Sequence, residues 1–138
     1  QQSSTALSCY DDSCAAGLLE AVTYVCVEER PVLFVAYDLP APAPLNGARP
    51  IASAFATALV FTPVVEQVFA TAEVTLTAAA GCDVSSAFSQ EFERLRLDNP
   101  AARLLPVLQA LAMERRATIN LNLLDDQRLI VEVKSCRH

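Results

Sequence analysis

Carboxylate and thiol side chains, the two groups here that most readily do chemistry, gather within six residues of one another: Cys9, Asp11, Asp12 and Cys14. Asp11 and Asp12 would make a carboxylate pair for acid–base catalysis. However, adjacent side chains point in different directions, and no base or metal ligand lies beside them in the sequence. We therefore expect one aspartate to cap a helix, a position that favours aspartate, and the other to line a pocket or an interface.

The thiols allow two further interpretations. Cys14 is the best candidate for a nucleophile, because a thiol in the first turn of a helix has a lowered pKa. No His, Lys or Arg lies near it in the sequence to activate it, and free cysteines usually act as small buried apolar side chains. Cys9 and Cys14 as a metal pair would leave two positions on zinc unfilled. We expect Cys14 to be structural and expect no metal and no cofactor.

These residues lie where a strand should turn into a helix. The pattern predicts a short apolar strand over Thr5–Cys9, a tight polar elbow at Asp11, Asp12 and Ser13, and an amphipathic helix capped by Asp12 or Ser13. The apolar positions of that helix share one face, which should be buried: Leu18, Leu19, Val22, Val25 and Cys26.

A second strand is predicted over 32–37, a nearly continuous apolar run typical of a strand buried on both faces. Strand, helix and strand in this order predict a right-handed βαβ unit with parallel strands. The proline-rich segment Asp38–Pro44 should be an extended surface connection, long enough to reach a neighbouring subunit.

The rest of the chain predicts further strands and helices. Ser53–Thr62 should be a buried strand and Val68–Thr77 a half-exposed one. A helix should run from Ser85 or Ser86 to Leu95. Another should begin at Asn99, with Pro100 at its first position, and reach about Met113, kinked or split at Pro106. A C-terminal hairpin should pair 118–123 with 128–134.

Composition limits the possible functions. The 138 residues suffice for one domain, and the 53% hydrophobic content with a positive mean hydropathy indicates an apolar partner surface. The net charge of −6 argues against nucleic acid as a partner, and no apolar run is long enough to span a membrane. The five irregularly spaced cysteines fit neither a disulfide framework nor a zinc site and indicate a reducing cytoplasm. We also expect no signal peptide at Gln1. The opening residues look like the interior of a fold, so we expect residues upstream to be missing.

Several stretches together carry a resemblance to a known family: SSTALSCYDDSCAAGLLEA, RPVLFVAYDLPAPAPL, SAFATALVFTP, LDNPAARLLPVLQALA and the closing hairpin. The chain resembles the small beta-ketoacyl-synthase-like proteins called chain-length factors, of the aryl polyene and xanthomonadin pigment type. The resemblance implies an α/β fold of the thiolase-like class, truncated, with a mixed β-sheet covered by helices and a C-terminal β-hairpin. It would form one domain over residues 1–138, without the early strands that the family places before Thr5.

The resemblance also implies a function. The position of the ketosynthase nucleophile falls on Asp11, which cannot form a thioester, and the two catalytic histidines have no counterparts because the chain holds only His138. This implies a non-catalytic subunit that forms a heterodimer with an active ketosynthase, meets acyl carrier protein through that complex, and bounds the tunnel of the growing chain. The Thr5–Cys9 strand would pair across the two-fold axis, which also hides an apolar edge. The candidates for tunnel and interface are Thr5, Leu7, Cys9, Tyr10, Asp11, Cys14, Ala15, Ala16 and Gly17.

Two alternatives stay open. The chain could be a stand-alone acyl-thioester transferase or hydrolase that uses Cys14 or Asp11, or a homodimeric binding module. Docking of acyl carrier protein on Arg115 and Arg116 is weakly supported, because the chain as a whole is acidic and these cations also suit a helix end.

Overall fold

A computed structural model describes residues 3–66, 68–81 and 83–136, and within them the chain is a small α/β fold with two sheets and four α-helices. The one-turn 3₁₀ helix η1 (Tyr10–Asp12) leads into α1 (Ser13–Glu28), and β1 (Val32–Asp38) and β2 (Phe55–Phe61) flank the short α2 (Leu45–Ala48). The second half contains β3 (Ala70–Ala78), α3 (Gln90–Asp98), the 3₁₀ helix η2 (Pro100–Leu104), α4 (Leu105–Ala112), β4 (Ala117–Leu123) and β5 (Gln127–Ser135).

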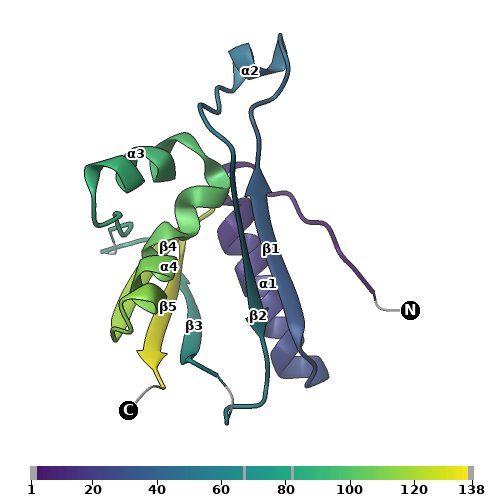
Figure 1. Ribbon diagram of the computed structural model, residues 1–138, viewed down its shortest axis with the longest axis vertical. Coiled ribbons are helices and arrows are strands. Elements are labelled where there is room, and N and C mark those ends of the chain that lie inside the picture. Colours follow the sequence, from purple (N-terminus) through teal and green to yellow (C-terminus); the bar gives the residue numbers. More distant parts are fainter. Residues whose placement is uncertain (1–2, 67, 82, 137–138) are drawn as a thin grey trace.

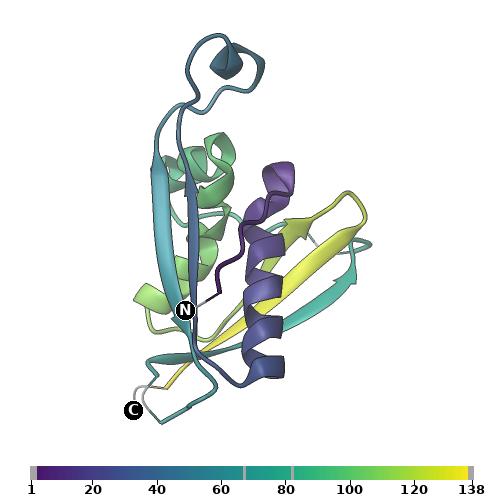
Figure 2. The same ribbon diagram turned by 90° about the vertical axis from the view of Figure 1, so that its right-hand side faces the viewer.

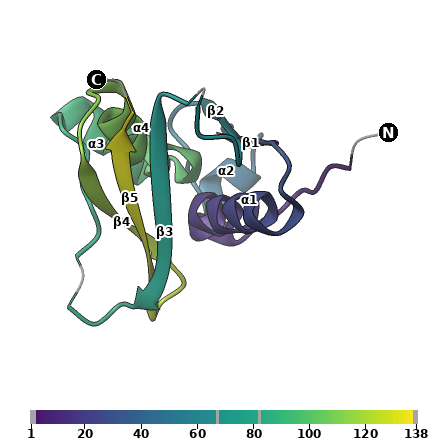
Figure 3. The ribbon, with the colours of Figure 1, turned by 90° about the horizontal axis from the view of Figure 1, so that it is seen from below.

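Both sheets are antiparallel. β1 pairs with β2, and β5 lies between β3 and β4. Helix α1 and the η2–α4 segment lie between the two sheets (Figures 1 and 2). Figure 3 shows the same layers from below, with α1 beside β1 and facing β3 and β5. The α/β class, the helices packed on sheets and the C-terminal hairpin of β4 and β5 are thus confirmed.

The predicted mixed sheet and parallel βαβ unit are wrong. Residues 3–9 are extended but form no strand in the described part of the chain, so the strand predicted over Thr5–Cys9 is absent there. β1 pairs instead with β2, which returns beside it in the opposite direction. β1 is also not buried on both faces: Phe34 points inward, while Leu33, Val35 and Tyr37 are exposed, because only one face of this sheet is covered by helices.

The core lies between the two sheets. Leu18 of α1 and Leu104 at the end of η2 are almost completely buried, in the same cluster as the inward side chains of β5, Leu129, Val131 and Val133. Gly17 lies where a side chain would meet the Phe34 ring, since a Cβ there would stand 3.0 Å from Phe34 Cε2. The small residue lets α1 lie close to β1. Cys26, predicted on the buried face of α1, is exposed.

The second half follows the predictions more closely. Asn99 accepts hydrogen bonds at the start of η2, and the helix predicted over 99–113 is split into two abutting helices, with Pro106 near the start of α4. The predicted helix start at Ser85 or Ser86 is wrong. Ser85 exchanges two hydrogen bonds with the backbone of Asn120 at the edge of β4 (2.9 Å each), so α3 begins later, capped by Ser89.

No helix in the described ranges is long and apolar enough to cross a bilayer.

Candidate functional site

The elbow between the extended N-terminal segment and α1 is a locally closed turn. The Cys9 N–H donates to Ser13 Oγ (2.8 Å), and the Ser13 hydroxyl donates to the Tyr10 carbonyl (2.6 Å). Tyr10 has a φ of 52°, a left-handed conformation that is rare for a bulky residue. Its exposed ring lies against Arg49, whose Cζ is 4.1 Å from the ring centroid. The turn therefore holds an aromatic side chain out toward solvent in a strained conformation.

Asp11 is paired with two arginines from distant parts of the chain. Arg49 Nη2 contacts Asp11 Oδ1, and Arg103 Nη2 lies 3.3 Å from Asp11 Oδ2. Arg49 comes from the connection between β1 and β2, and Arg103 comes from η2. The carboxylate at the elbow thus joins three segments.

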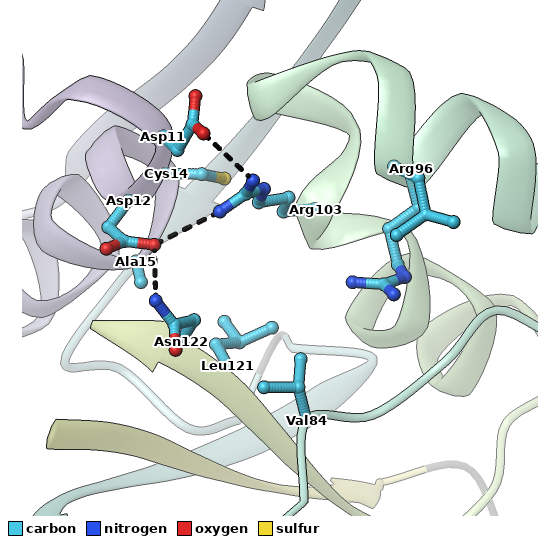
Figure 4. Close-up of a pocket in the computed structure, with 10 residues that line it drawn as sticks. Asp11, Asp12, Cys14, Ala15, Val84, Arg96, Arg103, Leu121 and Asn122 are labelled. Carbon is cyan, nitrogen blue, oxygen red and sulfur yellow. Dashed lines mark hydrogen bonds and ion pairs between the residues drawn. The ribbon is translucent and has the colours of Figure 1, made fainter. Parts of the chain in front are cut away.

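Asp12 is the more buried member of the pair, with a side chain 14% exposed. Its Oδ1 accepts from Arg103 Nη1 (3.2 Å) and Asn122 Nδ2 (2.9 Å), and its Oδ2 accepts from the Leu124 N–H (3.0 Å). Figure 4 shows Asp12 between Arg103 and Asn122. Asp12 occupies the N-cap position of α1, but its side chain makes no capping bond. The predicted helix-capping bond is therefore wrong, because these three donors occupy the carboxylate.

Cys14 points away from solvent, with 4% of its surface exposed, and its thiol donates to the Ala101 carbonyl (Sγ···O 3.7 Å). Burial raises the pKa of Cys14 from 9.0 to about 12, because desolvation outweighs the backbone hydrogen bond at Leu104 and the positive charge of Arg103. A protonated, buried thiol is a poor nucleophile.

A cavity of about 250 Å³ opens beside this network. Its charged wall is made by Asp11, Asp12 and Arg103, and Figure 4 shows the Arg96 guanidinium directed into it from α3. The other lining residues are Cys14, Ala15, Val84, Leu97, Leu121 and Asn122. A second, more open hollow shares Asp11, Asp12, Arg103 and Asn122 with this cavity, and its other lining residues are Cys9, Tyr10, Leu124 and Asp125.

Arg96 is held in place by Glu93, which accepts from its Nε (2.9 Å) and Nη2 (2.6 Å) and also from the Ala87 N–H (2.6 Å). These bonds, led by the one from Arg96, lower the pKa of Glu93 from 4.5 to about 2. Glu93 therefore stays ionised through the physiological range and fixes both α3 and the segment before it.

The predicted site residues fall into three groups. Cys9, Tyr10, Asp11, Cys14 and Ala15 line the two hollows at the elbow. Thr5 and Leu7 lie in the exposed N-terminal segment. Ala16 and Gly17 lie farther along α1, where Ala16 packs against the core.

Sequence reasoning missed the partners of the aspartates, Arg49, Arg103 and Asn122, as well as Arg96. Arg49 is 38 residues from Asp11, and Asn122 is 110 residues from Asp12. Periodicity and motif spacing in a sequence do not predict contacts between residues so far apart. Cys82, one of the five cysteines, and His138, the only histidine, lie outside the described residues.

Residues 3–66, 68–81 and 83–136 contain no group of three His, Cys, Asp or Glu side chains placed to hold a metal ion.

Residues 1–121 match the family model described as beta-ketoacyl synthase, N-terminal domain. The chain belongs to this family. Comparison with curated proteins and with solved structures found no match. The ketosynthase-like family inferred from the sequence motifs is thus confirmed.

Proposed function

We propose that this ketosynthase-like chain is a non-catalytic subunit of the chain-length-factor type, which forms a heterodimer with an active beta-ketoacyl synthase and bounds the tunnel that holds the growing acyl chain. The observation that carries the proposal is the state of Asp11. The family resemblance assigns this residue to the nucleophile position, and its carboxylate is paired with Arg49 and Arg103. A carboxylate cannot take the place of the thiol that forms the acyl thioester. The Asp11 carboxylate instead forms ion pairs that connect the elbow to two distant segments.

The properties of Cys14 favour this proposal over a stand-alone acyl-thioester transferase or hydrolase. With a pKa of about 12, roughly one thiol in 10⁵ is ionised at pH 7. The thiol proton is also donated to a backbone carbonyl, that of Ala101.

The N-terminal segment supports a dimer. Residues 3–8 are extended and exposed, including Leu7. An extended segment with an exposed backbone and an exposed leucine is suited to strand addition on a partner. We propose that Thr5, Leu7 and Cys9 lie at the subunit interface, and that pairing with the ketosynthase is favoured over a homodimeric binding module.

The proposed mechanism is steric. Tyr10, Asp11 and Cys14 at the elbow, followed by Ala15, Ala16 and Gly17 on α1, would limit how far the chain extends. The products would belong to fatty-acid- or polyketide-like pigments of the aryl polyene type. Acyl carrier protein would deliver its cargo to the complex in the cytoplasm, and the subunit itself would need no cofactor.

Co-expression with an active beta-ketoacyl synthase from the same organism tests the proposal, followed by size exclusion and intact mass of the eluted species. We expect a one-to-one complex, and no turnover of an acyl thioester by this chain alone. A folded chain that stays apart from the ketosynthase would refute the heterodimer. Turnover that disappears in Cys14→Ala would establish the enzyme alternative instead.

A further inference from the structure

The connection between β1 and β2 forms an arm, residues 39–54, which extends beyond the ends of both strands (Figures 1 and 2). Its outer part, residues 39–48, carries no charged side chain. Two large apolar side chains are displayed there, Leu39 at 59% and Leu45 at 65% exposure. Removing such exposed apolar surface from water is energetically favourable, so this projection is suited to contact with an apolar partner.

The outer part of the arm is held in shape by its own bonds. Pro40, Pro42 and Pro44 restrict the backbone of its outgoing half. The Gly47 N–H donates to the Pro44 carbonyl (3.0 Å), and the Asn46 side-chain oxygen accepts from the Ile51 N–H (3.0 Å). A segment already ordered in its exposed conformation loses little entropy on binding.

The base of the arm is fixed to the body. Asn99 is fully buried, and its Nδ2 donates to the carbonyls of Asp38 (3.3 Å) and Ser53 (2.9 Å), one on each side of the arm. Arg49 then joins the returning half of the arm to Asp11 and to the Tyr10 ring. The arm is therefore connected to the elbow, which directly follows the N-terminal segment that we propose for the interface.

We propose that the tip of this arm, centred on Leu39 and Leu45, inserts into an apolar groove on the ketosynthase subunit and is an anchor of the complex separate from the N-terminal segment. The identity of the partner rests on the proposed function. Proline-rich extended segments are well suited to apolar grooves on proteins. A lipid surface fits less well, because the chain carries a net charge of −6 and the outer arm has neither basic nor aromatic residues.

The test compares Leu45→Asp with a matched control, Phe88→Asp, in the co-expressed complex. Phe88 is 77% exposed and lies in the loop before α3, where its N–H donates to the Gln109 side chain of α4. We expect Leu45→Asp to weaken the complex about 30-fold or more, as for an interface anchor, and Phe88→Asp to leave the affinity unchanged. Circular dichroism spectra and melting temperatures of the variants provide the folding control.

A second measurement avoids the charge substitution. A photo-crosslinking phenylalanine analogue at position 45 should crosslink to the ketosynthase, and the same analogue at position 88 should not. A complex that forms with unchanged affinity in Leu45→Asp, and without a crosslink from position 45, overturns the role of the arm while the heterodimer stands. No complex with the unaltered chain overturns both. Sedimentation with anionic lipid vesicles that depends on Leu45 would assign the arm to a membrane and also overturn the proposal.

Discussion

Replacing Asp12 with alanine should destabilise the chain more than any other substitution at the elbow. The alanine removes the acceptor for three donors: the Arg103 guanidinium, the Asn122 amide and the Leu124 N–H. These bonds connect the start of α1 to η2 and to the β4–β5 hairpin. Their loss therefore weakens the connection between three elements that are distant in sequence.

The size of the stability loss depends on which hydrogen-bond partner remains for each of the three donors after the substitution. Arg103 keeps its pairing with Asp11, and the exposed Leu124 backbone becomes accessible to water. The half-buried Asn122 amide is the group with the least access to a replacement. A hydrogen bond to a charged group contributes about 1.5–3 kcal/mol, and groups that regain water lose less, so we expect the free energy of unfolding to fall by about 2–3 kcal/mol.

Urea unfolding of the purified chain, followed by far-ultraviolet circular dichroism, measures this loss. Asp12→Asn keeps the volume and one acceptor oxygen, and should lose about half as much. Asp125→Ala, in the exposed turn of the same hairpin, is the control and should stay within about 0.5 kcal/mol of the unaltered chain. If Asp12→Ala unfolds at the same urea concentration as this control, the three bonds do not hold the elbow and our account of it is wrong.

Three further predictions address the interior, the arm and the tunnel. Above about pH 9 the unfolded Cys14 thiol ionises while the native one stays protonated to about pH 12, so the unfolded state binds fewer protons and stability should fall by about 1.4 kcal/mol per pH unit. Urea midpoints measured from pH 8 to 11 should show this slope, and an equal slope in Cys14→Ala would contradict it. Asn99→Ala removes four hydrogen bonds from a fully buried side chain and should lower the free energy of unfolding by about 2–4 kcal/mol in the same assay. Asn99→Asp should lower it further at neutral pH, because its carboxylate would face two carbonyl oxygens. A smaller loss in Asn99→Asp than in Asn99→Ala would count against this geometry. Ala16→Phe should shorten the products of the complex or break the heterodimer, as judged by mass spectrometry of products and size exclusion; unchanged products from an intact complex would remove Ala16 from the proposed tunnel.

The sequence determined much of the local structure. Helix α1, the split helix at Pro106 and the C-terminal hairpin follow from apolar periodicity and proline geometry, which act over a few residues. The family was also recognisable from sequence, because its motifs occur in a fixed order. The exposed, proline-rich character of the arm follows from its composition alone.

The tertiary structure decided which elements meet. The sequence predicted a parallel pairing for β1, but strand pairing depends on which partner is available, and β2 occupies one edge of β1. It also placed a helix start at Ser85, where local capping preference is overridden by bonds to the edge of β4. Local propensity is a weak prior against such contacts.

In the candidate site too, the sequence predicted the local features and the fold decided the contacts between distant residues. Sequence reasoning found the elbow and its aspartates, because an acidic turn before an amphipathic helix is a local signal. It predicted a helix-capping bond for Asp12, which is wrong. It also missed Arg49, Arg103 and Asn122, since these side chains reach the elbow only after the sheets and helices have packed. An ion pair depends on distance in space and leaves no periodic trace in the chain. The sequence therefore determined where the elbow is, and only the fold decided what its carboxylates bind.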